Sequence, residues 1–269
     1  MSKTGKIIWI VALVVLVVLI GVIGFGYIKK LTYSAENPVA TMEVENFGTI
    51  KMELYPDQAP QTVANFITLA NRGFYDGLTF HRIMKDFMIQ GGDPKGNGTG
   101  SAKISNLKDD GEDTEYTIKG EFIANKVNNK TAMEEGTLAM ARSDYSQYSS
   151  SLSDESYNSG SCQFFIVTAN NSNTAALDGL YTAFGKVTEG LDVVHKIAEV
   201  EVKAAEGSEG NENAEVSTPV NAPKITSIRV ETNGVDYGLP ETLEPFDYSS
   251  WLYKQYGIDP SSTGTTAVE

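Results

Sequence analysis

Apolar and polar residues begin to alternate shortly after position 37, and this pattern predicts a pair of antiparallel strands. Ala40, Met42 and Val44 alternate with polar neighbours, and the same period of two returns over residues 50–54. The intervening residues 46–48 are typical of a turn, so we expect a half-buried hairpin. Further strand-like runs lie at 79–84, 87–90, 137–141, 163–168, 181–185 and 224–230.

Two segments carry the period of an amphipathic helix. Pro60 is suited to the first turn of one helix and Gly73 to its C-terminal cap, with an apolar stripe between them. The second segment is 189–198, where Leu191, Val194 and Ile197 would face inward. Many short strands with only two helices predict an antiparallel barrel or sandwich with helical caps, rather than a βαβ sheet.

The first thirty residues contain the longest apolar run of the chain. Residues 7–28 carry no charge, and a helix of that length spans roughly 33 Å, close to the thickness of a hydrocarbon core. A cleavable signal peptide is the alternative, but its apolar region is usually only about 7–15 residues long. The sequence therefore favours a single-pass anchor at 1–30 and a linker at 31–37. We expect an extracytoplasmic domain on a bacterial cell membrane.

Composition narrows the function of the remaining chain. The 269 residues have a formal net charge of −14, and the first thirty contain no acidic residue, so the body is strongly acidic. Such a body repels phosphate backbones, which argues against nucleic acid as a partner. One cysteine and two histidines are too few for an internal disulfide or the usual zinc sites. We expect no metal and no organic cofactor.

Several stretches are poor in apolar residues and are expected to be surface loops. They are 101–115, 144–159 and 204–219. Residues 236–269 form a C-terminal tail in which aromatic residues precede a polar end. The main domain is therefore predicted at 38–235.

Three separated motifs in this domain resemble those of the cyclophilins, a family of peptidyl-prolyl cis-trans isomerases. They read FHRIMKDFMIQGGDP at 80–94, GSCQFFI at 160–166 and LDGLYTAFG at 177–185. The resemblance implies a closed eight-stranded antiparallel barrel capped by two helices. It also implies rotation about X-Pro peptide bonds of proline-containing polypeptides, and so assistance in the folding of extracytoplasmic proteins.

Amide rotation needs an apolar pocket for the proline ring, a grip on the flanking peptide and a hydrogen-bond donor for the twisted nitrogen. A guanidinium is suited to the donor role because it is permanently charged and rigid. By similarity to the family, Arg82 is that catalytic donor. The substrate-binding residues that the resemblance implies are Phe87, Met88, Gln90, Ala141, Arg142, Gln163, Phe165, Leu177 and Tyr181. Strand parity independently places Gln163 and Phe165 on one face, with residues 164 and 166 turned toward the core.

The chain departs from the family pattern at two positions. Ala176 stands where many members carry an aromatic residue that contacts cyclosporin, and Tyr181 replaces a common histidine. We therefore expect isomerase activity with weakened cyclosporin binding. His81 should face away from Arg82 in its strand, and Cys162 is expected to be a small buried residue.

Two other interpretations of the same chain stay open. The groove could bind proline-containing peptides without turning them over, as a non-catalytic module. Alternatively, the acidic loops and the aromatic tail could recruit a partner to a scaffold on the cell surface. An assay comparing the wild type with Arg82→Ala separates the first interpretation from catalysis, and removal of 236–269 tests the second.

Overall fold

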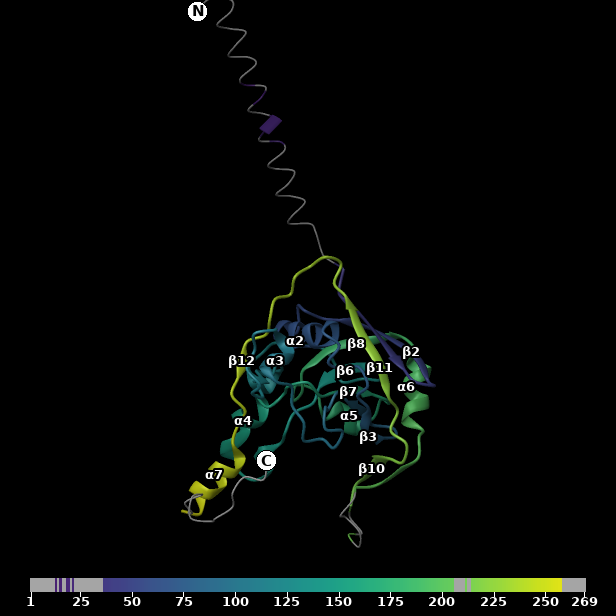
Figure 1. Ribbon diagram of the computed structural model, residues 1–269, viewed down its shortest axis with the longest axis vertical. Coiled ribbons are helices and arrows are strands. Elements are labelled where there is room, and N and C mark those ends of the chain that lie inside the picture. The colour runs from purple at the N-terminus through teal and green to yellow at the C-terminus, as the bar shows by residue number, and fades with distance from the viewer. Residues whose placement is uncertain are drawn as a thin grey trace, which may run out of the picture. The chain divides into compact units, whose positions relative to one another are not determined.

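The computed structural model describes residues 36–205, 211 and 214–257, together with positions 13, 15, 18, 19 and 21 (Figure 1). The chain divides into two units, Met1–Glu36 and Asn37–Glu269. Positions 13, 15, 18, 19 and 21 are helical, and the rest of the expected anchor lies outside the described residues.

The predicted membrane anchor is corrected by the structure. A helix must hold about 20 consecutive apolar residues to span a bilayer. Within the described part of the chain, no helix reaches the length and apolar character that this requires. The prediction of a single-pass protein anchored in a bacterial cell membrane is therefore contradicted.

One eight-stranded antiparallel sheet dominates the second unit, in the order β11-β1-β2-β8-β6-β7-β4-β3. Its strands are β1 (Val39–Val44), β2 (Gly48–Leu54), β3 (Phe80–Met84), β4 (Met88–Gly91), β6 (Thr137–Met140), β7 (Phe164–Val167), β8 (Ala183–Glu189) and β11 (Ile225–Glu231). The predicted hairpin is confirmed, because β1 pairs with β2 and buries every second residue. All the other predicted strand segments overlap a strand of this sheet.

The predicted closed barrel is wrong, because the sheet is strongly curled but open. A barrel closes only when its edge strands pair along their length. Here the edges β3 and β11 are joined only near their beginnings, by an isolated bridge between Thr79 and Lys224 and by hydrogen bonds around it. A separate antiparallel pair, β9 (Val202–Ala204) with β10 (Val216–Pro219), lies against β3.

Both predicted capping helices are present, as α2 (Pro60–Asn71) and α6 (Leu191–Ala198). Pro60 is in the first turn of α2, and Gly73 adopts a positive φ of 77° just beyond its end. Glu121, far away in sequence, receives hydrogen bonds from the first backbone amides of α2. Helix α6 begins later than predicted because Gly190 has a left-handed conformation, with φ 85°.

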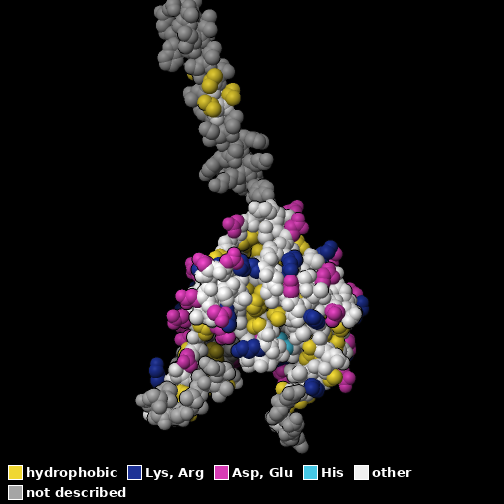
Figure 2. Space-filling view, viewed as in Figure 1, with side chains coloured by type: hydrophobic (Ala, Val, Ile, Leu, Met, Phe, Trp, Pro, Cys, Tyr) yellow, Lys and Arg dark blue, Asp and Glu magenta, His cyan; other side chains and the backbone are white. Residues whose placement is uncertain are grey.

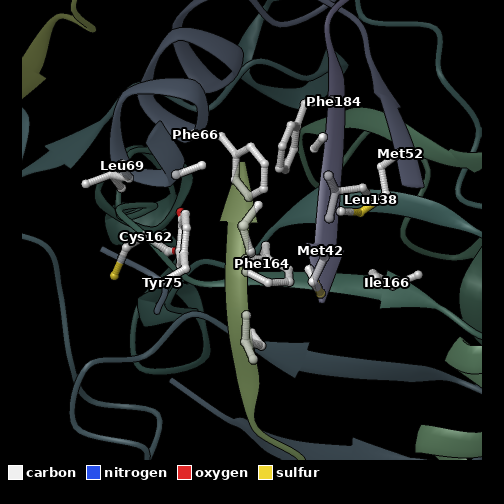
Figure 3. Close-up of a cluster of buried hydrophobic side chains, with 14 of the residues drawn as sticks. Met42, Met52, Phe66, Leu69, Tyr75, Leu138, Cys162, Phe164, Ile166 and Phe184 are labelled. Carbon is white, nitrogen blue, oxygen red and sulfur yellow. The ribbon is translucent and has the colours of Figure 1, made fainter. Parts of the chain in front are cut away.

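Aromatic rings fill the core between α2 and the concave side of the sheet (Figure 3). Phe66 of α2 lies with its ring centre 5.3 Å from those of Tyr75 and Phe184, and 5.8 Å from that of Phe164. All four side chains are fully buried. Offset and edge-on contacts of this kind add to the hydrophobic effect of burial, so this cluster fixes α2 on the sheet.

The segments predicted as loops contain short elements of their own. They include α3 (Ile104–Leu107), η2 (Tyr145–Gln147), η3 (Ser150–Leu152), α4 (Ser153–Tyr157) and β10. Leu107 and Leu152 are buried, and their packing explains why these otherwise polar segments form regular structure. Elsewhere the chain forms η1 (Ile123–Asn125) and α5 (Ser172–Ala175).

The C-terminal tail is also attached to the domain. Strand β12 (Thr242–Leu243) pairs with β5 (Thr117–Ile118), and α7 (Tyr248–Gln255) follows it (Figure 1). Tyr145 packs against Phe246 and Tyr248, with ring centres 5.2 and 5.9 Å apart.

On the face seen in Figure 2, acidic and basic side chains are interspersed rather than gathered into one basic patch.

Candidate functional site

A cavity of about 210 Å³ is lined by most of the residues that the sequence analysis predicts for the site. Of the ten predicted site residues, nine line it. They are Arg82, Phe87, Met88, Gln90, Ala141, Arg142, Phe165, Leu177 and Tyr181. The tenth, Gln163, lies beside it and is hydrogen-bonded to Gln90.

Strand register explains why residues from distant motifs meet. Arg82 of β3 is opposite Gln90 of β4, and Gln90 is opposite Phe165 of β7. Because opposed residues share one face of a sheet, these three side chains project together. Their neighbours Ile89 and Phe164 turn to the other face and join the core, as strand parity predicts.

The wall and floor of the cavity are apolar. Met88 and Phe165 belong to a buried hydrophobic cluster separate from the main core, with Leu177 and Tyr181 packed against it. The rings of Phe165 and Tyr181 meet edge to face, with centres 5.6 Å apart. A small apolar notch of this kind fits a compact ring better than a charged or extended side chain.

Arg82 presents one edge of its guanidinium to this notch. Its Nη1 lies 3.4 Å from Oε1 of Gln90 and 3.8 Å from the sulfur of Met88. On the opposite edge, Nε and Nη2 donate to the two carboxylate oxygens of Glu215, at 2.6 and 2.7 Å. The cavity therefore combines an apolar surface with a permanent positive charge at its rim. Glu215 is a partner that sequence reasoning missed.

A pair of amide side chains holds the polar edge in place. Gln90 donates through Nε2 to Oε1 of Gln163 at 2.9 Å. Gln163 in turn donates to the backbone carbonyls of Gly98 and Gly100, at 3.1 and 2.9 Å. This chain leaves Oε1 of Gln90 directed at Arg82, so the turn at 96–100 orients the polar edge of the site.

A second, larger cavity of about 500 Å³ adjoins the first. The two share Gln90, Ala141 and Arg142, so Arg142 stands between them. Residues of the 144–159 segment and of the tail, among them Tyr145 and Phe246, line the larger cavity. The sequence did not indicate this cavity, because part of its wall is formed by segments that carry no recognisable pattern.

The remaining candidate nucleophiles and ligands lie outside this site. Burial lowers the pKa of His81, whose side chain is not among those that line the cavity. Burial also raises the pKa of the Cys162 thiol to about 12, which makes it a poor nucleophile. Among residues 36–205, 211 and 214–257, no group of three or more His, Cys, Asp or Glu side chains is arranged to hold a metal ion.

Comparisons with known proteins show which family the chain is similar to. A family model described as cyclophilin type peptidyl-prolyl cis-trans isomerase/CLD matches residues 39–230. Peptidyl-prolyl cis-trans isomerase B of Bacillus subtilis is 40% identical over 159 residues, which cover 59% of this chain and 90% of that protein. Peptidyl-prolyl cis-trans isomerase-like 1 of Rhizopus delemar is 39% identical over 160 residues, covering 59% of this chain and 79% of that protein.

A solved structure shares the fold. The crystal structure of a cyclophilin type peptidyl-prolyl cis-trans isomerase from Cryptosporidium parvum superimposes with a TM-score of 0.54 at 24% identity, covering 73% of this chain and 99% of that one. A second structure of the same protein, determined in the presence of the dipeptide Ala-Pro, gives a TM-score of 0.51 at 25% identity, covering 72% and 99%.

Proposed function

Since this chain belongs to the cyclophilin-type peptidyl-prolyl cis-trans isomerase family, we propose that the 210 Å³ cavity is its active site and that Arg82 is the catalytic residue. The observation that carries the proposal is the position of Arg82 Nη1 at the rim of an apolar notch, within 4 Å of Met88 and Gln90. The isomerase domain proposed on this basis comprises residues 38–235.

The reaction needs no covalent step. An amide resists rotation because the nitrogen lone pair is delocalised into the carbonyl, which gives a barrier of about 18–20 kcal/mol. In the twisted state the lone pair returns to the nitrogen, which then accepts a hydrogen bond. A guanidinium that donates to this nitrogen stabilises the twisted state more than the planar one, and this difference accelerates rotation.

Each group around Arg82 has a role in this scheme. The proline ring occupies the notch formed by Phe87, Met88, Phe165 and Leu177, with Tyr181 closing one side. Gln90 and Gln163 provide polar contacts to the flanking peptide, and the backbone at Ala141 and Arg142 borders the groove. No step requires a proton transfer. This is consistent with a cavity lining in which Arg82, Arg142 and Tyr181 are the titratable groups.

Proline-containing polypeptides are the proposed substrates. Uncatalysed X-Pro isomerisation takes tens to hundreds of seconds and is slow enough to limit folding. The cavity is open to solvent and takes one ring, so a proline in an unfolded or extended segment can enter it. The Cryptosporidium parvum relative studied with Ala-Pro supports this substrate class. Assistance to protein folding follows as the proposed role.

A proline-peptide isomerisation assay on the full chain tests the proposal. Arg82→Ala should lower kcat/KM by about a hundredfold or more, which is the usual loss when one preorganised donor is removed from an active site. Arg72→Ala is the matched control, because its guanidinium pairs with the exposed Asp109. Equal rates for wild type and Arg82→Ala, with peptide binding retained, would instead identify a non-catalytic binding module.

A further inference from the structure

The carboxylate of Glu215 is hydrogen-bonded to one edge of the Arg82 guanidinium. Its two oxygens accept separate hydrogen bonds, from Nε at 2.6 Å and from Nη2 at 2.7 Å. Two parallel bonds of this kind define the plane of the guanidinium as well as its position. Arg82 is therefore held by a residue that comes 133 positions later in the chain.

The structure also shows how Glu215 is held. Glu215 directly precedes β10, which lies against β3, the strand that carries Arg82. Two residues on, the buried Ser217 donates its hydroxyl to Oε1 of Glu215 at 2.6 Å. This hydrogen bond ties the Glu215 carboxylate to the start of β10 and so holds it beside Arg82. A chain of hydrogen bonds thus connects Ser217, Glu215 and Arg82.

These hydrogen bonds leave Nη1, the nitrogen proposed to act in catalysis, unobstructed by Glu215. Glu215 takes up Nε and Nη2, whereas Nη1 remains on the side of Gln90 and Met88. Arg82 lines the 210 Å³ cavity and Glu215 does not. The carboxylate accordingly restricts the arginine without filling the space that a proline ring would take.

We propose that Glu215, supported by Ser217, is a positioning residue that fixes Arg82 with its Nη1 directed into the proline cavity. This inference rests on the function proposed above. An arginine side chain has several rotatable bonds, and an unrestrained one would spend much of its time away from the reacting nitrogen. Both partners are partly solvent-exposed, so screening weakens their Coulomb attraction and the main benefit is geometric.

An inhibitory role for the contact between Glu215 and Arg82 predicts the opposite kinetic result. A carboxylate that competed with substrate for the guanidinium would be inhibitory, and its removal would raise activity. The position of Glu215 outside the cavity favours positioning over competition. Kinetics of variants separate the two directly, because the sign of the change differs.

The experiment measures kcat and KM of the full chain for a proline peptide. Glu215→Ala should lower kcat by about tenfold with KM little changed, since misplacing a catalytic group by about 1 Å costs up to about a hundredfold. Glu215→Gln keeps one acceptor and should lie between Ala and wild type. Ser217→Ala should give a smaller loss in the same direction. Glu199→Gln, which removes a comparable exposed ion pair with Lys85, is the matched control and should match wild type.

A double variant and a spectroscopic signal complete the test. In the Arg82→Ala background, Glu215→Ala should have no further effect, because a positioning residue acts through the group that it positions. The Nε–Hε NMR signal of Arg82 should shift in Glu215→Gln, even where activity is too low to measure. Circular dichroism establishes that each variant is folded, and the half-exposed Glu215 makes Glu215→Gln a mild change.

Several results would overturn the inference. They are unchanged or increased kcat in a folded Glu215→Ala variant, an equal further loss in the Arg82→Ala background, or an unmoved Arg82 signal. Failure of the proposed function is distinguishable, because the wild type itself would then show only the spontaneous rate.

Discussion

The guanidinium carbon of Arg142 lies 4.5 Å from the centre of the Tyr181 ring, on the wall that separates the two cavities. Its Nε donates to the carbonyl of Leu180 at 3.0 Å, and Nη1 donates to the carbonyl of Ser143 at 3.1 Å. Arg142 therefore joins the loop that carries Tyr181 to the segment after β6. The cation–π contact and the two backbone hydrogen bonds hold Tyr181 against Phe165 at the side of the proline cavity.

Replacement of Arg142 should loosen this wall. A cation–π contact is worth about 0.5–2 kcal/mol, so we expect Arg142→Ala to raise KM for a proline peptide about two- to thirtyfold. The change in kcat should be smaller, because Arg82 is untouched. Arg142→Lys keeps the charge but loses the planar fork, and should give an intermediate KM. An Arg142→Ala enzyme with wild-type KM would contradict this account.

The proline cavity was predictable because its residues lie in short motifs on regular strands. Arg82, Gln90 and Phe165 come from three strands whose alternation already shows which side chains share a face. The structure brings them together at one cavity.

Long-range partners and sheet closure could not be inferred in the same way. Glu215 and Glu121 lie in segments without periodicity, and their partners are set by the tertiary structure rather than by neighbours in sequence. Closure of the sheet depends on pairing between β3 and β11, which no local pattern encodes. The family resemblance suggested a closed barrel, whereas the edge strands meet only near Thr79 and Lys224.

Glu121 should be essential to the stability of α2. Its buried carboxylate accepts hydrogen bonds from the amides of Gln61 and Thr62, at 3.0 and 2.8 Å, and from the Thr62 hydroxyl at 2.7 Å. Glu121→Ala leaves these donors without a partner, so we expect the free energy of unfolding to fall by about 3 kcal/mol. Urea titration measures this loss. The exposed Glu112→Ala should stay within about 0.5 kcal/mol of wild type, and an equal effect of both variants would refute the capping role.

Cys162 should be unreactive in the folded protein. The side chain is fully buried, and burial raises its pKa to about 12, so at about pH 8 roughly one thiol in ten thousand is ionised. We expect no alkylation by iodoacetamide under native conditions and complete alkylation in denaturing urea, as followed by mass spectrometry. Rapid labelling of the native protein would show that the core around Phe164 and Tyr75 opens readily.

The ion pair between Asp76 and Arg229 should make stability depend on pH in the acid range. Nη1 and Nη2 of Arg229 donate to the two Asp76 oxygens at 2.7 and 2.5 Å, linking β11 to the turn after α2. These hydrogen bonds lower the pKa of Asp76 below its ordinary value. Its stabilising effect is therefore complete above the unfolded-state pKa of about 3.9 and is lost as pH falls through the lower folded-state pKa.

Comparison of wild type with Asp76→Asn in urea at several pH values measures this effect. Because both side chains are more than one-third exposed, we expect the wild type to be more stable by only about 0.5–1 kcal/mol near neutral pH. The difference should shrink steadily below about pH 4, as protonation of Asp76 removes its charge in the wild type as well. Asp110→Asn is the control, since its carboxylate lies 4.0 Å from the amine of Lys108 on an exposed surface. A difference between wild type and Asp76→Asn that grew as pH fell would contradict the assigned direction of the Asp76 pKa.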